Sequence, residues 1–215
     1  MMIHVVGDSH VMLFTGQKLP WLLVVPEDLK PRGYDIQPGF TTYFVALLRA
    51  YWIDNGLFWQ ILGTLPKGST VIIVAGEIDC RGPILNVAHR TGRTIEVVTM
   101  ECVDRYLIGV RKVKEMGLNP IIFAPYAQMD LTEIKHEWVL LPEYLTPQEW
   151  GAQKKRAVLA FEEYLRRDEF PVISLNEWMF ANHVHESTEY WADAIHLSEK
   201  VWPFIEAQIK EEADV

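Results

Sequence analysis

The sequence has little cysteine and no long hydrophobic run. Its 215 residues include only two cysteines, Cys80 and Cys102, and a chain of this length needs no disulfide framework. The apolar stretch at residues 21–25 is too short to cross a bilayer, and no other run approaches the roughly 18 apolar residues of a membrane span. No basic segment followed by an apolar core opens the sequence, so we expect no signal peptide, no membrane association and a cytoplasmic location.

Positive charge is also scarce, with 20 Lys and Arg residues against 29 Asp and Glu residues and a formal net charge of -9. Affinity for nucleic acid depends on cations that neutralise phosphates, so we expect no nucleic-acid partner. Hydrophobic residues make up 49% of the chain and charged residues 23%, as is typical of a globular protein. The length predicts a single domain over residues 1–215, because two domains would take about 300 residues.

Short β-branched runs alternate along the chain with longer amphipathic segments, which predicts a mostly parallel sheet in a three-layer α/β/α sandwich. We expect five strands, at 3–6, 34–37, 70–75, 119–125 and 170–175. We expect one helix to begin at Thr41 and others to span 94–116, 148–167 and 197–211. Residues 10–32 and the Gly- and Pro-containing stretch that follows Gly76 are predicted to be loops, and 126–146 an insertion or lid.

The first strand ends in Gly7, Asp8 and Ser9, which places a hydroxyl group at the carboxyl end of a predicted parallel strand. Ligands and chemistry are found at this edge of open α/β sheets. Ser9 is therefore a candidate nucleophile, provided that a base and a group that orients the base lie nearby. The alternative is that Ser9 only caps the turn or helix that follows.

Asp193 and His196 supply such a pair near the other end of the chain. At a spacing of three residues, the carboxylate can accept a hydrogen bond from the Nδ1 atom of the imidazole, which leaves Nε2 free to take a proton from a hydroxyl group. A local hydrogen-bonded turn is the alternative interpretation of the same spacing.

Taken together, the Gly-Asp-Ser triplet, the Pro-Gly turn at Gly39, the Gly-x-x-Asp after the third strand and the Asp-x-x-His before the last helix resemble the SGNH (GDSL-type) hydrolase superfamily along the whole chain. The resemblance implies a flavodoxin-like sandwich and a Ser-His-Asp triad of Ser9, His196 and Asp193. It also implies that the N–H group of Gly39 joins that of Ser9 in an oxyanion hole, and that no cofactor or metal takes part.

The block after the third strand departs from this pattern. The family has Gly-x-Asn-Asp there, and the Asn side chain donates to the oxyanion; here Ile78 stands at the Asn position and cannot donate. Arg81 is the first candidate to replace it, followed by Asn86 and His89, while a salt bridge from Arg81 to Glu77 or Asp79 is the alternative. We expect Asp79, which matches the Asp of the block, to be structural.

Other polar and aromatic residues support weaker hypotheses. His10 either lines the pocket or is an exposed turn residue. His183 and His185, with Glu186, have the outline of a zinc site but no third histidine or cysteine completes it. Cys80 either has a lowered thiol pKa beside Arg81 or simply packs. The aromatic residues of the insertion either stack on sugar rings or form a small core of their own; these residues are Trp138, Tyr144 and Trp150.

The first functional hypothesis is a serine esterase acting on a small-molecule or carbohydrate acyl ester, with an O-acetyl group on a sugar as one candidate substrate. An acyltransferase using the same site is the second. A catalytically weak module that binds glycans or a protein is the third, because the third oxyanion donor is missing. The sequence leaves the substrate, the oligomeric state and the biological role open.

Overall fold

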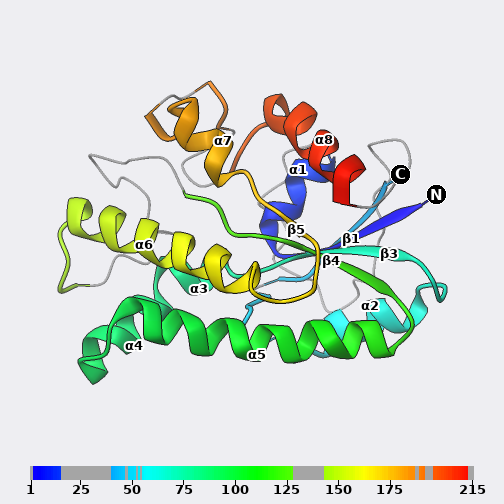
Figure 1. Ribbon diagram of the computed structural model, residues 1–215, viewed down its shortest axis with the longest axis horizontal. Helices are drawn as coiled ribbons and strands as arrows, with labels where there is room; N and C mark the ends of the chain where they lie inside the picture. Colours follow the sequence, from blue (N-terminus) through cyan, green and yellow to red (C-terminus); the bar gives the residue numbers. More distant parts are fainter. Residues whose placement is uncertain are drawn as a thin grey trace.

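In the described part of the computed structural model, five parallel strands form one sheet (Figure 1). The structure describes residues 2–15, 40–46, 48–51, 53, 55–127, 143–186, 189–191 and 196–212. The strands are β1 (Ile3–Gly7), β2 (Phe40–Phe44), β3 (Thr70–Val74), β4 (Asn119–Phe123) and β5 (Val172–Ile173). Their order is β2-β1-β3-β4-β5, which is the flavodoxin-like order. The chain therefore moves outward in opposite directions from β1, and ligands bind at the carboxyl end of the strand where this reversal occurs.

Helices cover both faces of the sheet (Figure 1). One face packs against α2, α4, α5 and α6, and the other against α1, α7 and α8. The helices are α1 (Met12–Thr15), α2 (Gly56–Thr64), α3 (Glu77–Arg81), α4 (Pro83–Thr91), α5 (Ile95–Glu115), α6 (Pro147–Leu165), α7 (Asn176–Ala181) and α8 (Trp202–Glu212), with short 3-10 turns at Ser9–Val11, Val184–Glu186 and Glu199–Val201. The predicted three-layer α/β/α sandwich is confirmed.

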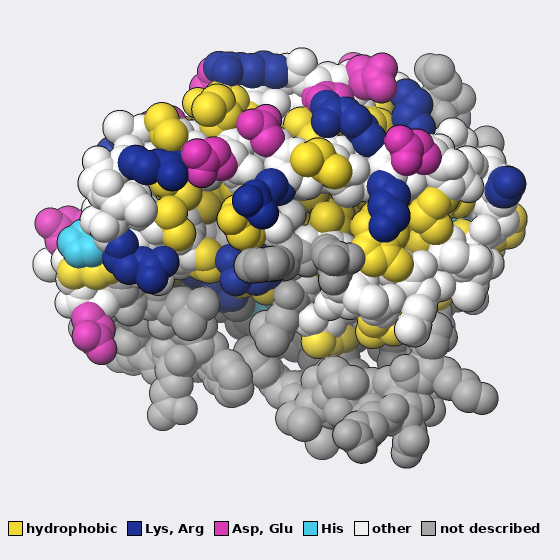
Figure 2. Space-filling view, turned by 90° about the horizontal axis from the view of Figure 1, so that it is seen from below, with side chains coloured by type: hydrophobic (Ala, Val, Ile, Leu, Met, Phe, Trp, Pro, Cys, Tyr) yellow, Lys and Arg dark blue, Asp and Glu magenta, His cyan; other side chains and the backbone are white. Residues whose placement is uncertain are grey.

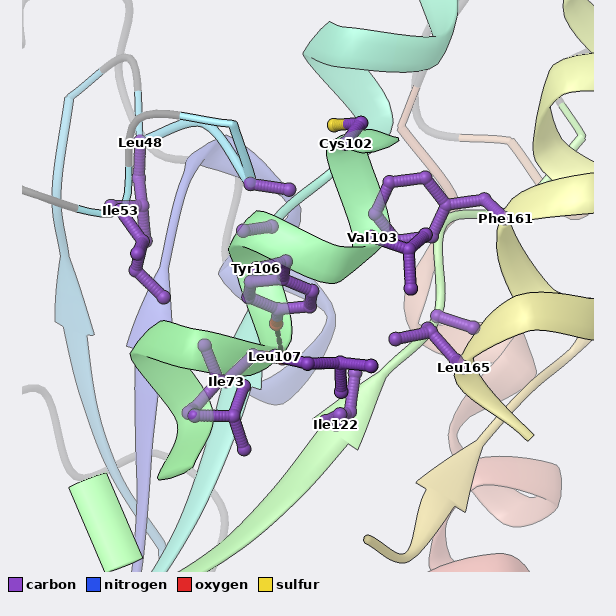
Figure 3. Packing of buried hydrophobic residues seen from close by; sticks show 14 of the residues in the cluster. Leu48, Ile53, Ile73, Cys102, Val103, Tyr106, Leu107, Ile122, Phe161 and Leu165 are labelled. Atoms are coloured by element: carbon purple, nitrogen blue, oxygen red, sulfur yellow. Dashed lines mark hydrogen bonds between the residues drawn. The ribbon is translucent and has the colours of Figure 1, made fainter. Parts of the chain in front are cut away.

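The strand side chains alternate between the two layers, as the two-residue period of a strand requires. In β3, Val71 and Ile73 belong to the core cluster under α5 and α6, whereas Ile72 and Val74 belong to the cluster under α1 and α8. Figure 3 shows Tyr106 of α5 reaching the strand, where its hydroxyl group donates to the carbonyl oxygen of Ile73 at 3.4 Å. Burial on both faces explains the continuous apolar sequence of this strand.

The predictions for the first, third and fourth strands and for the helix at 94–116 are confirmed, as is the helix at 148–167 to within two residues. The strand expected at 170–175 is present but shorter, at Val172–Ile173. The last helix begins later than expected, at Trp202. The helix expected from Thr41 is wrong: Phe40–Phe44 is strand β2, held by its pairing with β1, and this tertiary pairing overrides the helical spacing of the apolar residues. The expected strand at 34–37 and most of the insertion, 128–142, lie outside the described residues.

The stretch after Gly76 is also not the predicted loop. It forms α3 and α4, separated by one residue, Gly82. Pro83 occupies the first turn of α4, where its missing N–H group costs no hydrogen bond. The Gly-Pro pair therefore marks a boundary between two helices.

Basic and acidic side chains are interspersed with hydrophobic ones on the face shown in Figure 2. Ion pairs between neighbouring elements join many of the charges, as in Lys114–Glu169 at 3.0 Å and Arg156–Glu96 at 2.7 Å. Within the described part of the chain, no helix is both long and apolar enough to cross a membrane.

Gly7 ends β1 at a point where the backbone of β3 comes very close. A Cβ atom at this position would lie 2.2 Å from the carbonyl oxygen of Val74 and 2.5 Å from its Cβ atom. On either side of Gly7, the chain is fixed by hydrogen bonds, from the Asp8 N–H group to the Val74 oxygen at 3.1 Å and from the Val45 N–H group to the Gly7 oxygen at 2.7 Å. Only glycine fits this junction without displacing a strand.

We therefore expect Gly7→Ala to lower the free energy of unfolding by about 3 kcal/mol, because the new methyl group overpacks a rigid backbone contact. Urea denaturation measures the change. Gly151→Ala is the matched control: its helical position has nothing within 4 Å of an added Cβ atom, so it should stabilise the protein by roughly 0.5–1 kcal/mol. Equal stability of the two variants would contradict the close contact at Gly7.

Asp79 of α3 ties the end of the third strand to the chain that follows β2. Its carboxylate accepts hydrogen bonds from the Ala50 N–H group at 2.7 Å and from Nε of Arg49 at 3.1 Å, and it is fully buried. Burial raises the pKa of Asp79, although Arg49 and the backbone amides act in the opposite direction. The expectation of a structural role for Asp79 agrees with these contacts.

Asp79→Ala should cost about 2–4 kcal/mol of unfolding free energy, because it leaves a buried N–H group and a partly buried guanidinium group without their acceptor. Asp79→Asn should cost less, since the amide oxygen still accepts and burial already favours a neutral group here. Glu169→Ala, which removes an exposed ion pair, should cost no more than about 1 kcal/mol. Thermal and urea unfolding of the three variants test this order; a loss in Asp79→Ala as small as in Glu169→Ala would refute it.

Candidate active site

Ser9 lies at the carboxyl end of β1, at the start of the 3-10 turn Ser9–Val11. The Val11 N–H group donates to the Asp8 carbonyl oxygen at 3.1 Å, which is the hydrogen bond that closes a 3-10 turn. Asp8 is buried, whereas Ser9 is partly exposed. Local structure thus presents the Ser9 hydroxyl group at the edge of the sheet where the strand order reverses.

His196 lies next to Ser9 although 187 positions separate them in the sequence. Its Nε2 atom is 2.9 Å from the Ser9 Oγ atom, and its side chain is buried. At this distance a neutral imidazole can accept the hydroxyl proton, which is the first requirement for an activated serine nucleophile. Asp193, the expected orienting residue, and Gly39, the expected backbone donor, lie outside the described residues.

Tyr126 holds the backbone beside His196. Its hydroxyl group accepts a hydrogen bond from the Leu197 N–H group at 3.4 Å, and Leu197 forms an isolated antiparallel bridge with Trp191. The Trp191 indole N–H group in turn donates to the Val184 carbonyl oxygen at 2.9 Å. No sequence pattern pointed to Tyr126, because it lies just after β4 in a stretch expected to be an insertion.

A buried polar cluster lies beside this pair. His10 is only 2% exposed, and its Nδ1 atom is 3.0 Å from Oδ1 of Asp8. On the other side of the ring, Nε2 is 3.8 Å from Oε2 of Glu77, and Nη2 of Arg81 is 3.6 Å from the same Glu77 oxygen. The structure therefore contradicts the alternative in which His10 is an exposed turn residue.

The charges of the cluster act on His10 in opposite directions. Burial lowers the pKa of His10, but the Asp8 carboxylate, through its charge and its hydrogen bond, and the Glu77 carboxylate raise it, while Arg81 opposes them. The net result is a raised pKa. The cavity next to the cluster has a volume of about 10 Å³ and is lined in part by Asp8, His10, Glu77 and Tyr126. Such a volume is at most that of one water molecule, so it cannot hold a substrate.

Arg81 and Ile78 lie on α3, whose first turn follows Gly76. Gly76 has a φ of 109°, a left-handed conformation, and an added Cβ atom would lie 2.8 Å from the Phe161 ring. Ile78 is buried but belongs to neither of the two hydrophobic clusters formed by the described residues. Arg81 is 9% exposed and faces Glu77, so the salt bridge named as the alternative is present. The Trp150 indole N–H group donates to the Arg81 carbonyl oxygen at 2.8 Å.

Asn86 and His89 lie on α4, at a second cavity. Asn86 accepts a hydrogen bond from the Tyr144 hydroxyl group at 3.1 Å, and the His89 ring stacks on the Tyr144 ring at 3.6 Å. The cavity has a volume of about 700 Å³ and extends between α4 and α5. The described residues that line it do not include Ser9 or His196, so the structure does not bring Asn86 together with that pair.

The cysteine, aromatic and histidine residues of the weaker hypotheses lie in different environments. Burial raises the pKa of the Cys80 thiol well above its ordinary value, so Cys80 packs as an ordinary core residue. Trp150 is fully buried in the core, whereas Trp138 lies outside the described residues. His183 is exposed and His185 is buried, and no cluster of three or more potential metal ligands occurs in the part of the chain that the structure describes.

Solved structures with the same fold cover nearly the whole chain, although no protein-family model and no curated protein matches the sequence. The lipase Lip_vut3 from a goat rumen metagenome has a TM-score of 0.54 at 12% identity, over 99% of this chain and 97% of its own. The acetyl xylan esterase AlAXEase has a TM-score of 0.55 at 11% identity, over 98% of each chain. A lipase/acylhydrolase from Enterococcus faecalis has a TM-score of 0.52 at 16% identity, over 99% of this chain and 95% of its own.

Further neighbours include a member of the lipolytic G-D-S-L family from Veillonella parvula, with a TM-score of 0.51 at 14% identity, over 98% of this chain and 97% of that one. At such identities the likeness concerns the fold. It agrees with the resemblance of the opening and closing sequence motifs and with the strand order. The chain has the fold of the SGNH (GDSL-type) hydrolases.

Proposed function

We propose that the protein is a serine esterase that hydrolyses an acyl ester through Ser9 and His196. The observation that carries this proposal is the 2.9 Å contact between the Ser9 Oγ and His196 Nε2 atoms at the carboxyl end of β1. The fold supports it, because the structural neighbours include proteins described as lipases and an acetyl xylan esterase. The latter makes a carbohydrate-linked O-acetyl group one candidate substrate.

The reaction would proceed in two steps. His196 accepts the Ser9 proton as Oγ attacks the ester carbonyl carbon, and the same imidazolium then protonates the departing alcohol, which leaves an acyl group on Ser9. In the second step His196 takes a proton from water as the water oxygen attacks the acyl carbon. The imidazolium then returns this proton to Ser9 Oγ as the bond between Oγ and the acyl carbon breaks, which releases the carboxylic acid and restores the Ser9 hydroxyl group and the neutral His196. Asp193 would hold the imidazole in the required tautomer.

The oxyanion formed in each step would be held by the N–H groups of Ser9 and Gly39. Ile78 supplies no third donor, and the loss of one donor typically costs about 10²–10³ in rate. Arg81 is the proposed replacement, since its buried Nε atom has no hydrogen-bond partner among the residues that the structure describes. The substrate would displace part of its 3.6 Å interaction with Glu77.

One observation favours a second candidate, a module that binds an acyl ester or a glycan and turns it over slowly or not at all. Ile78 occupies the position of the missing amide, and the guanidinium group of Arg81 faces Glu77. If this arrangement persists with substrate bound, the site has only backbone donors. Reaction of Ser9 with a fluorophosphonate distinguishes the two candidates, because only an activated serine reacts rapidly.

We expect Ser9→Ala to abolish labelling by a fluorophosphonate probe and to reduce the hydrolysis of p-nitrophenyl acetate by at least about 10³-fold. Ser69→Ala is the matched control, since Ser69 precedes β3 at the opposite end of the sheet and should leave both signals intact. Mass spectrometry of the labelled peptide identifies the modified residue. Unchanged hydrolysis in Ser9→Ala would show that the proposed nucleophile is wrong.

The missing donor gives a second prediction, for two variants of opposite effect. Arg81→Met should lower kcat by about 10²-fold, and Ile78→Asn should raise it by up to about the same factor, because each changes the number of oxyanion donors by one. Arg167→Met, which removes an exposed cation paired with Glu163, is the control and should have no effect. Steady-state kinetics at saturating ester concentration measure kcat for the three variants. A wild-type kcat in Arg81→Met would exclude Arg81 as an oxyanion donor.

A further inference from the structure

The second cavity, between α4 and α5, has no part in the reaction proposed above. Its volume is about 700 Å³, which is within the range of roughly 300–1,000 Å³ that small-molecule sites occupy. The described residues that line it come from the chain after β2, from α3, from α4 and α5 on one face of the sheet (Figure 1), and from Tyr144 before α6. Neither Ser9 nor His196 is among them, so a ligand held there would be separate from the catalytic pair.

An aromatic wall is already formed at this cavity. The Tyr144 ring stacks on the His89 ring, with centroids 3.6 Å apart and planes inclined by 7°. The Tyr144 hydroxyl group donates to Oδ1 of Asn86 at 3.1 Å, which fixes the Tyr144 ring against α4 and leaves the Nδ2 group of Asn86 as a donor. Tyr144 is 36% exposed, so part of its surface is open to a ligand. Such rings favour a second flat ring in stacked or edge contact.

The aliphatic side chains at the cavity offer less surface. Ile84 and Val98 line it but are only 3% and 5% exposed, and the neighbouring Cys102 is 2% exposed. An alkyl chain would therefore make fewer contacts here than a flat ring that lies against the Tyr144–His89 pair. The cavity favours an aromatic ligand over an aliphatic one.

The charges at the cavity leave one cation without a partner. The Nη2 atom of Arg49 is 3.0 Å from Oδ1 of Asp79, and Oε2 of Glu101 is 2.6 Å from Nη2 of Arg93. Arg90, the other charged residue among the described lining residues, is exposed and forms no ion pair in the described part of the chain. One unpaired cation matches one negative charge on a ligand.

Arg90 lies beside the aromatic wall. It follows Asn86 by four positions on α4, and residues at this spacing share one side of a helix. Its charge also reaches Tyr144, because it opposes the rise that burial causes in the pKa of the Tyr144 hydroxyl group. A guanidinium group next to ring surface is suited to a ligand that combines an aromatic ring with a carboxylate.

We propose that the second cavity is a binding site for an aromatic carboxylate, with its ring against the His89–Tyr144 pair and its carboxylate accepting hydrogen bonds from Arg90 and Asn86. A phosphate dianion fits less well, because its second charge would find only the carboxylates of Asp79 and Glu101. The proposal goes beyond the esterase function and does not depend on it.

The test is the binding of 2-naphthoate to the full chain, measured by isothermal titration calorimetry beside two analogues. 2-Naphthamide keeps the ring and loses the charge, whereas octanoate keeps the charge and loses the ring, so each should bind at least about 5-fold more weakly. The NMR signals of the His89 ring protons should move on binding of 2-naphthoate, while those of the exposed His183 should not. Ser9→Ala should bind 2-naphthoate as the wild type does.

Arg90→Gln should weaken the binding of 2-naphthoate by about 5-fold and leave the binding of 2-naphthamide unchanged, because it removes only the charge. Arg167→Gln is the matched control: it removes an exposed cation paired with Glu163, away from the residues that line the cavity, and should have no effect. Tyr144→Ala should weaken the binding of both naphthalene compounds.

The proposal would be overturned if 2-naphthoate did not bind, or if either analogue bound as tightly. Unmoved His89 signals, lost binding in Ser9→Ala, or equal losses in the two arginine variants would overturn it as well, since each places the ligand elsewhere.

Discussion

The contact between Ser9 and His196 depends on two backbone segments that are fixed independently of each other. Ser9 is placed by the junction of β1 and β3, where Gly7 allows the strands to approach and hydrogen bonds to Val74 and from Val45 fix the chain on either side. His196 is placed from the other side by Leu197, which is held by Tyr126 and by its bridge to Trp191. A side-chain hydrogen bond needs an accuracy of a few tenths of an ångström, and rigid elements supply it better than loops do.

The short helix α3 connects this contact to the rest of the fold. Its first residue, Glu77, faces the polar cluster beside Ser9, while Asp79, two residues later, faces the opposite way and binds the chain after β2. Two carboxylates at this spacing lie on different sides of a helix. The indole N–H group of Trp150, on α6, donates to the carbonyl oxygen of Arg81 at the end of α3. A shift of α3 would therefore disturb the contacts of Glu77 and of Asp79 together. The packing of the core thus sets the position of Glu77 relative to His10.

The sequence predicted those parts of the molecule that depend on local patterns. The buried strands were found because burial on both faces produces a continuous apolar run, as in Thr70–Val74, and α5 because its apolar face repeats with a helical period. The strand Phe40–Phe44 was missed because its pairing with β1 is a property of the sheet. Ser9 and His196 were found together only through the resemblance of both chain ends to one family, since no rule of spacing connects residues 187 positions apart. The contact of His10 with Glu77 has no local signal at all, and Asp193 and Gly39 remain predictions.

Ile78, which departs from the motif that the sequence resembles, lies on α3, the helix that also carries Glu77 and Arg81. Under the proposed function, Ile78 would leave the tetrahedral state with one donor fewer, which would make that state harder to reach. His10, which follows Ser9, is buried against Asp8 and Glu77, and Arg81 faces the same Glu77 carboxylate. A positive charge near the site also favours a developing oxyanion, because Coulomb interactions in a poorly hydrated environment extend over several ångströms. Under the proposed function, the guanidinium group of Arg81, in the buried cluster with Asp8, His10 and Glu77, would offset through its charge part of what the site loses in hydrogen bonding.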